Sequence, residues 1–75
     1  MYVVIESFDG EINVDVCANI ESARYKKEEY IKYLDDNGIN YTLENNENNY
    51  FDAEINDMLY TIEIRKTKIY DINIL

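Results

Sequence analysis

The sequence predicts an α+β fold: one antiparallel sheet of four to six strands with a single helix on one face, in the order β-β-α-β-β-β. Three observations favour this fold. Apolar and polar residues alternate on both sides of Asp9-Gly10, one stretch carries apolar residues three and four apart, and a second alternating pair flanks Asn56-Asp57. The simplest packing places the helix on the sheet. Seventy-five residues predict a single domain, residues 1–75.

Residues 1–17 are predicted to form a β-hairpin, because Asp9-Gly10 is a favoured two-residue type I′ turn. Pairing Phe8 with Glu11 and counting outward gives two faces. One face carries Val3, Ile5, Ile12, Val14 and Val16. The other carries Tyr2, Val4, Glu6, Phe8, Glu11, Asn13 and Asp15. Since a half-buried hairpin turns its apolar face to the core, we expect the first face to meet the helix.

Residues 19–38 are predicted to hold the helix. Asn19 is the N-cap candidate, with Ser22 as the alternative, and Gly38 supplies the left-handed residue after the last turn. The apolar stripe is formed by Ile20, Ala23, Tyr30, Ile31 and Leu34. Lys27 falls on this stripe, so its methylene groups are expected to lie along the apolar surface.

Three stretches follow the helix. Residues 39–44 alternate and predict a strand, residues 45–49 predict an exposed loop, and residues 50–56 predict another strand. The apolar face of the last of these is formed by Phe51, Ala53 and Ile55.

A second two-residue turn is predicted at Asn56-Asp57, which pairs Ile55 with Met58 and again aligns two apolar faces. Residues 69–75 predict a final strand.

The net charge is −9, from sixteen acids and seven bases, and no base lies between Tyr33 and Ile64. Glu28 stands four residues from Arg24 and from Lys32, a spacing that neutralises that face of the helix. The surplus charge therefore falls on the sheet and its loops. It argues against direct binding of nucleic acid or of anionic membranes, and it favours basic partners.

The surplus acids predict a binding face on the side of the sheet that the helix leaves open. Residues two apart on a strand lie about 6.7 Å apart, which is comparable to neighbouring phosphates, and aromatic rings would add anchors. We therefore expect this face to occupy the basic groove of a larger nucleic-acid-binding protein. Asp35 and Asp36 are included because negative charge at a helix C-terminus is unfavourable and suggests another role. The predicted partner-binding residues are Tyr2, Glu6, Phe8, Glu11, Asp15, Asp35, Asp36, Glu44, Glu47, Tyr50, Asp52, Glu54, Asp57 and Glu63.

Residues that commonly carry catalysis are missing from the sequence. It contains no His, and its one cysteine, Cys17, has neither a His partner nor a second Cys for an internal disulfide. We expect no enzymatic activity, no cofactor and no specific metal site. The lone thiol and the lack of a signal peptide or long apolar run predict a cytoplasmic location.

Small size, acidity and richness in Asn, Ile, Lys, Glu and Tyr resemble the small inhibitors encoded by phages and mobile elements, of the anti-CRISPR and anti-restriction type. The resemblance implies a non-enzymatic inhibitor that acts in the host-cell cytoplasm. One alternative is a homodimeric or accessory-subunit interaction module. The other is a sponge for a signalling nucleotide, which would need a basic pocket built from Arg24, Lys26, Lys27, Arg65, Lys66 and Lys68.

Overall fold

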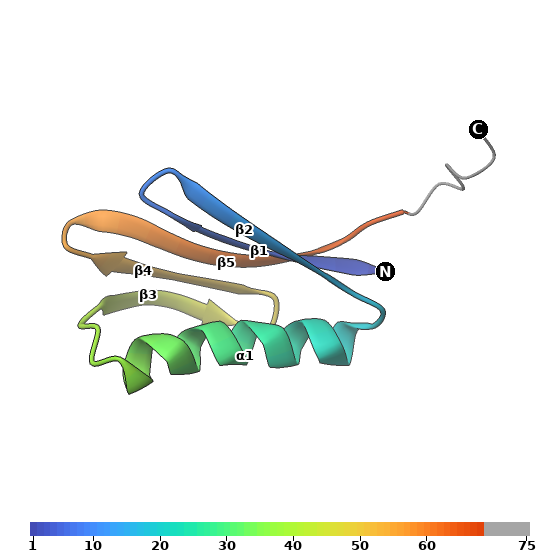
Figure 1. Ribbon diagram of the computed structural model, residues 1–75, viewed down its shortest axis with the longest axis horizontal. Helices are drawn as coiled ribbons and strands as arrows, with labels where there is room; N and C mark the ends of the chain where they lie inside the picture. The colour runs from blue at the N-terminus through green and yellow to red at the C-terminus, as the bar shows by residue number, and fades with distance from the viewer. Residues whose placement is uncertain (69–75) are drawn as a thin grey trace.

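A computed structural model describes residues 1–68 and shows one antiparallel five-stranded sheet with a single helix (Figure 1). The elements are β1 (Tyr2–Phe8), β2 (Glu11–Cys17), α1 (Ile20–Asp36), β3 (Thr42–Glu47), β4 (Tyr50–Ile55) and β5 (Met58–Lys66). The predicted fold class and element order are therefore confirmed. The strand predicted for residues 69–75 lies outside the described residues.

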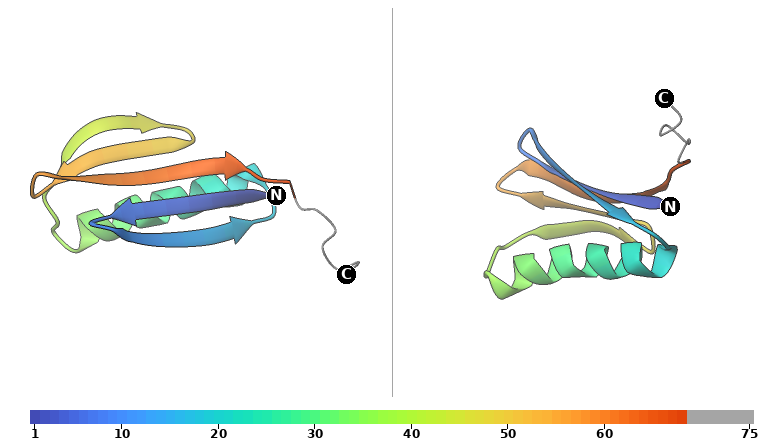
Figure 2. Two further views of the ribbon diagram at one scale, coloured as in Figure 1. Left: turned by 90° about the horizontal axis from the view of Figure 1, so that it is seen from above. Right: turned by 45° about the vertical axis from the view of Figure 1, so that its right-hand side comes forward.

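The strands lie in the order β2-β1-β5-β4-β3, so the first and last of the described strands are neighbours inside the sheet. Helix α1 connects β2 at one edge to β3 at the other and lies along one face, as the two views of Figure 2 show. The other face carries no second layer within the described part of the chain (Figure 2). This two-layer arrangement leaves one face of the sheet open.

Both tight turns form as predicted. Asp9 and Gly10 adopt φ values of 50° and 81°, and Asn56 and Asp57 adopt 51° and 65°, which are the left-handed conformations that a type I′ turn requires. The hairpin register follows from them, with Phe8 opposite Glu11 and Ile55 opposite Met58. The predicted strand pairing is thus confirmed at both hairpins.

Helix α1 begins and ends as its sequence predicts. The side chain of Asn19 accepts a hydrogen bond from the Ser22 amide at 2.8 Å, which confirms Asn19 as the N-cap. At the other end Gly38 has a φ of 65°, and the amide of Ile39 donates to the carbonyl of Leu34 at 3.0 Å. This left-handed turn satisfies carbonyl groups that the helix leaves without a partner.

The strand after the helix differs from the prediction. It spans Thr42–Glu47, so Asn45 and Asn46 are strand residues rather than loop residues. The pairing with β4 is irregular between Leu43 and Asn45, where Glu44 is an extra residue in the strand. The strand therefore continues past Glu44 through two asparagines of low strand propensity, which the sequence pattern alone did not indicate.

The core lies between α1 and the face of the sheet turned toward it. Val4 and Ile62 are fully buried on neighbouring strands, and Phe51 is almost fully buried on β4. Within residues 1–68, the buried core residues are Val4, Ala23, Ile31, Leu34, Phe51, Ala53, Ile55, Tyr60, Ile62 and Ile64. Val4 belongs to the hairpin face that the sequence analysis assigned to solvent, so that assignment of faces is wrong.

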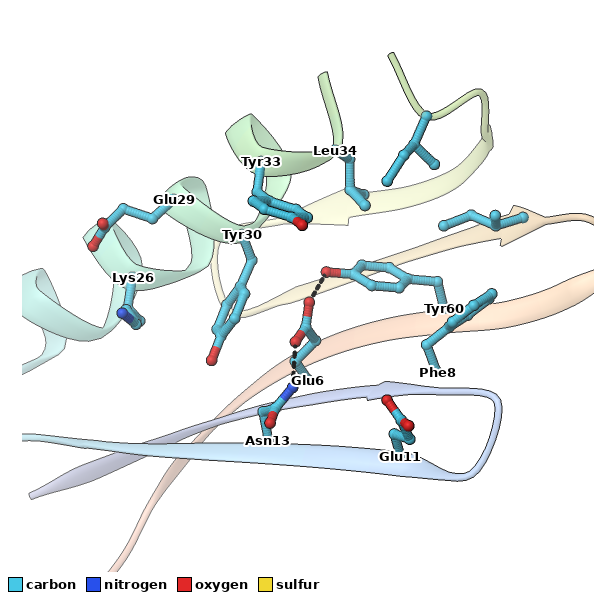
Figure 3. A pocket seen from close by; sticks show the side chains of 12 residues that line it. Glu6, Phe8, Glu11, Asn13, Lys26, Glu29, Tyr30, Tyr33, Leu34 and Tyr60 are labelled. Atoms are coloured by element: carbon cyan, nitrogen blue, oxygen red, sulfur yellow. Dashed lines mark hydrogen bonds between the residues drawn. The ribbon is translucent and has the colours of Figure 1, made fainter. Parts of the chain in front are cut away.

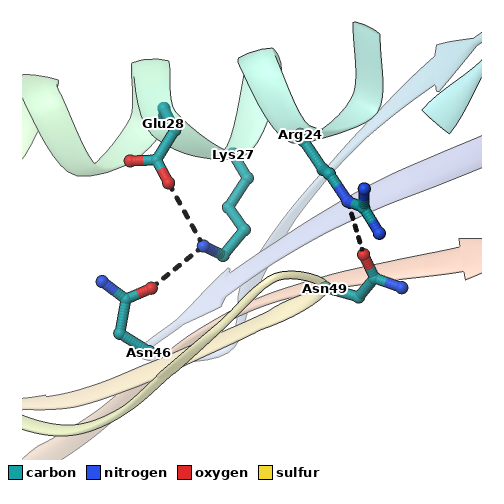
Figure 4. A network of polar contacts seen from close by, with 5 residues as sticks. All are labelled: Arg24, Lys27, Glu28, Asn46 and Asn49. Carbon is teal, nitrogen blue, oxygen red and sulfur yellow. Dashed lines mark hydrogen bonds and ion pairs between the residues drawn. The ribbon is translucent and has the colours of Figure 1, made fainter. Parts of the chain in front are cut away.

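Lys27 is buried on the helix face, with 2 % of its surface exposed. Its Nζ donates to Asn46 Oδ1 at 3.0 Å and lies 3.4 Å from the carboxylate of Glu28 (Figure 4). Nearby, Arg24 Nε donates to Asn49 Oδ1 at 3.1 Å. The ammonium is therefore satisfied from both sides, whereas the predicted pairing of Glu28 with Arg24 and Lys32 is absent from residues 1–68.

Candidate functional site

The face of the sheet turned away from α1, here called the open face, has two chemically different halves. Strands β1 and β2 form the apolar half, which carries Val3, Ile5, Ile12, Val14 and Val16. Strands β3, β4 and β5 form the acidic half, which carries Glu47, Tyr50, Asp52, Glu54 and Glu63. The two halves meet where β1 pairs with β5.

The register shows how closely the halves join. One row crosses all five strands in the order Val14, Ile5, Glu63, Tyr50 and Glu47, each residue opposite the next. Neighbouring strands lie about 4.8 Å apart, so an apolar pair and a pair of acids flanking a tyrosine share a row about 19 Å long. A partner that contacts this row meets both kinds of surface at once.

The apolar half is exposed to an unusual degree. Ile12, Val14 and Val16 on β2 have 65, 57 and 63 % of their surface exposed. Single exposed apolar residues are ordinary, but a contiguous group of them on one strand marks an interaction surface. The apolar half therefore belongs to the candidate site, although the sequence analysis placed it in the core.

The acidic half is only partly neutralised. Arg65 is the one base on the open face among the described strand residues, and its guanidinium donates to Glu63 at 2.7 and 3.2 Å. The acids without a basic partner on this face are Glu47, Asp52 and Glu54. Unneutralised acids of this kind attract basic surfaces.

Asp52 is held in place by two neutral donors. Tyr50 Oη donates to one of its oxygens at 3.0 Å, and Asn45 Nδ2 donates to the other at 2.9 Å. Partial burial and this hydrogen bond to Asp52 raise the pKa of Tyr50. The two donors fix the orientation of the Asp52 carboxylate.

The hairpin residues that were predicted to bind a partner do not lie on the open face. Tyr2, Glu6, Phe8, Glu11 and Asp15 lie on the side of the sheet turned toward α1. The prediction that these five residues join the acids of β4 and β5 is wrong. The cause is the pairing of β1 with β5, which places the hairpin face carrying Val4 beside the buried residues of β5.

Two of these acids bind tyrosine hydroxyls instead of facing solvent. Tyr60 Oη donates to Glu6 at 2.5 Å, and Tyr30 Oη donates to Asp15. Burial, followed by the bond to the acid, raises the pKa of Tyr60 and of Tyr30 well above the ordinary value. These carboxylates are accordingly part of the helix–sheet interface.

The other predicted acids are dispersed. Asp35 accepts from Tyr41 Oη at 3.0 Å, and Asp36 pairs with Lys32 at 2.6 Å, so both acids at the helix end have local partners. Glu44 lies at the bulge of β3, and Asp57 lies in the turn between β4 and β5. None of the four extends the row of acids on the open face.

Two of the six bases that a nucleotide sponge would require lie apart. Lys27 is buried between α1 and the sheet, whereas Arg65 lies on the open face, so the sheet separates them. Each also has an acidic neighbour, Glu28 and Glu63 respectively. Within residues 1–68 no group of three or more Cys, Asp and Glu residues is arranged to hold a metal ion.

The fold and the site together define a small α+β domain whose open face has two chemically different halves. Comparison with protein-family models, with curated proteins and with solved structures finds no match for the chain. In the described residues, no helix has the length and apolar character needed to cross a membrane.

Proposed function

We propose that this chain is a non-enzymatic protein-binding domain that docks its open face on a larger protein, covering basic residues with the acidic half and an apolar surface with the apolar half. The observation that supports this most strongly is the row in which Ile5 stands directly opposite Glu63. Unneutralised acids steer a basic partner, and exposed branched side chains supply the area that holds it.

The specific form we propose is an inhibitor that occupies a nucleic-acid site on its partner. Asp52 and Glu54 lie two residues apart on β4, a spacing of about 6.7 Å, and Tyr50 adds an aromatic ring beside them. The smaller acidic half, rather than the whole sheet, would therefore replace the phosphates. The apolar half then makes contacts beyond the nucleic-acid site and gives the inhibitor its selectivity.

The test compares two doubly neutralised variants with the natural chain. D52N/E54Q removes two charges from the open face and keeps the side-chain shapes, whereas E21Q/E29Q removes two charges from the exposed side of α1 and keeps Glu28 beside the buried Lys27. Partners are captured from cells of the source organism at about 0.05 and 0.5 M NaCl, where screening differs strongly, and are then purified. The first variant should bind the purified partner about three- to tenfold more weakly at low salt, and the second should bind unchanged.

Inhibition is measured as displacement of nucleic acid from that partner by the natural chain. Equal binding by both variants, or binding indifferent to salt, would contradict the docking of the acidic half. Binding without displacement of nucleic acid would contradict only the inhibitor form of the proposal.

A second candidate function is a homodimeric module, and it is favoured by the position of the apolar half at an edge of the sheet. The outer side of β2 has no strand paired with it in the described chain, and Val14 and Val16 are exposed beside it. Two copies could pair these strands and bury the apolar residues together. Light scattering over a hundredfold range of protein concentration tests the dimer. A rise of the mass to twice that of the monomer, abolished in V14T/V16T, supports it. A constant monomer mass rejects it.

A further inference from the structure

A pocket of about 560 Å³ lies on the other side of the sheet, between α1 and the turn end of the β1–β2 hairpin (Figure 3). It exists because the hairpin twists away from the helix toward its turn, as Figure 1 shows. Its volume falls within the range of about 300–1,000 Å³ that small-molecule sites occupy. Residues from α1, β1, β2 and β5 line it, so it is a feature of the folded domain.

Aromatic rings form much of the pocket wall. Tyr60 and Phe8 lie side by side with ring centroids 6.0 Å apart, and Tyr30 and Tyr33 face them from α1 (Figure 3). The faces of aromatic rings attract cations. A cation of the chain itself lies over one of these rings, because the Nζ of Lys26 is 5.7 Å from the centroid of the Tyr30 ring.

The pocket also holds a carboxylate without a counter-ion. Glu6 is half-buried, and its oxygens accept hydrogen bonds from Tyr60 Oη and, at 3.0 Å, from Asn13 Nδ2. Both donors are neutral, and none of the ion pairs in residues 1–68 includes Glu6. A partly desolvated charge is costly without an opposite charge, so the site favours a cation.

The other charged residues that line the pocket also favour a cation. Glu11 and Glu29 add two acids, and Lys26 is the one base among the described residues that line the pocket. An anionic ligand would meet net negative charge, and a neutral ligand would leave Glu6 without compensation. The combination of ring faces and acids is the one that recognises organic ammonium ions.

We propose that this pocket binds a small organic ammonium ion whose methyl or methylene groups lie against Phe8, Tyr30 and Tyr33 while Glu6 balances its charge. The inference goes beyond the proposed docking function, because the pocket and the open face lie on opposite sides of the sheet. The ammonium group comes either from a free amine or from a lysine side chain of a partner. Both sources share the same chemistry and are separated by the probes.

The first experiment titrates the chain with choline, with its neutral isostere 3,3-dimethyl-1-butanol and with Nα-acetyl-Nε-trimethyllysine methylamide, while NMR follows the tyrosine ring signals. Choline or the lysine derivative should bind at least about fivefold more tightly than the alcohol, because only they carry the charge. Tighter binding of choline assigns a free amine, and tighter binding of the lysine derivative assigns a side chain. Binding of both cations no tighter than that of the alcohol, or no saturable shift with any probe, overturns the proposal.

Variants of matched charge locate the site. E6Q removes the carboxylate from the pocket and should weaken binding of the preferred cation about fivefold or more, whereas E44Q makes the same charge change at the bulge of β3 and should leave it unchanged. K26Q removes the competing cation and should strengthen binding about twofold.

Because Glu6 also contacts Tyr60, the fold of E6Q is checked by circular dichroism. Y33L provides a second route, since Tyr33 is 62 % exposed and its replacement leaves the core intact. It should lower cation affinity about threefold. Unchanged cation affinity in both E6Q and Y33L overturns the proposal.

Discussion

Tyrosine hydroxyls, rather than basic side chains, donate hydrogen bonds to several of the carboxylates. Within residues 1–68, four of them donate to carboxylates: Tyr30 to Asp15, Tyr41 to Asp35, Tyr50 to Asp52 and Tyr60 to Glu6. A phenol satisfies a carboxylate without cancelling its charge. A chain with sixteen acids and seven bases can therefore order its acids and remain strongly negative.

Stability should fall at alkaline pH because of Tyr60. Burial and the bond to Glu6 raise its pKa, so the folded state keeps the proton above pH 10 and the unfolded state, with a pKa of about 10, releases it. The contribution is fully present below about pH 10 and is lost as pH rises further, by about 1.4 kcal/mol per pH unit for this one group. Urea unfolding between pH 8 and 11 measures it.

Tyr60→Phe is the control for this titration. It should be less stable at pH 8, because Glu6 loses a donor, but its free energy of unfolding should fall less steeply above pH 10. Parallel curves for the two proteins would contradict the role assigned to Tyr60.

At the level of elements, the hairpin shows how far its sequence specifies its structure. The turn and the register of residues 2–17 could be predicted, because Asp9-Gly10 fixes the two central residues and alternation fixes the rest. The covered face could not, since Val3 and Ile5 look as apolar as Val4 and Phe8. The deciding information is the pairing of β1 with β5, which joins residues more than fifty positions apart.

Only part of the candidate site was predicted correctly from the sequence. Tyr50, Asp52 and Glu54 were placed correctly because Phe51, Ala53 and Ile55 leave no doubt about the buried face of β4. Glu6 and Asp15 were misplaced because the tyrosines that accommodate them lie on other elements. Tyr60, Ile62 and Ile64 alternate along β5. Matching this alternation to alternate residues of β1 could have corrected which hairpin face was predicted to be covered.

The two hairpin faces should respond differently to the same substitution. Val4→Ala removes methyl groups from a fully buried position and should lower the free energy of unfolding by about 2–3 kcal/mol. Val14→Ala, at a position 57 % exposed, should cost less than about 1 kcal/mol. Chemical denaturation of both variants measures the difference. A larger loss in Val14→Ala would mean that α1 covers the opposite face.

For the molecule as a whole, repulsion among like charges opposes folding. The net charge is −9, and the three ion pairs found in residues 1–68 each include an exposed partner, so they contribute little. Raising NaCl from about 0.02 to 0.5 M should therefore increase the midpoint of thermal unfolding, because screening weakens repulsion more than attraction. Calorimetry measures the shift.

E21Q/E29Q tests the cause of this salt effect. The variant carries two fewer negative charges, so its unfolding temperature should rise less with salt than that of the natural chain. A midpoint that falls with added NaCl in the natural chain would show that attraction dominates.

The bulge in β3 limits what copies of this molecule can build. The extra residue at Glu44 and the acids around it hinder a further strand from joining that border of the sheet, whereas β2 is regular along its length. If copies of the chain associate edge to edge, a further strand would join at β2 alone. Two molecules joined through β2 would then form a closed pair rather than a fibre.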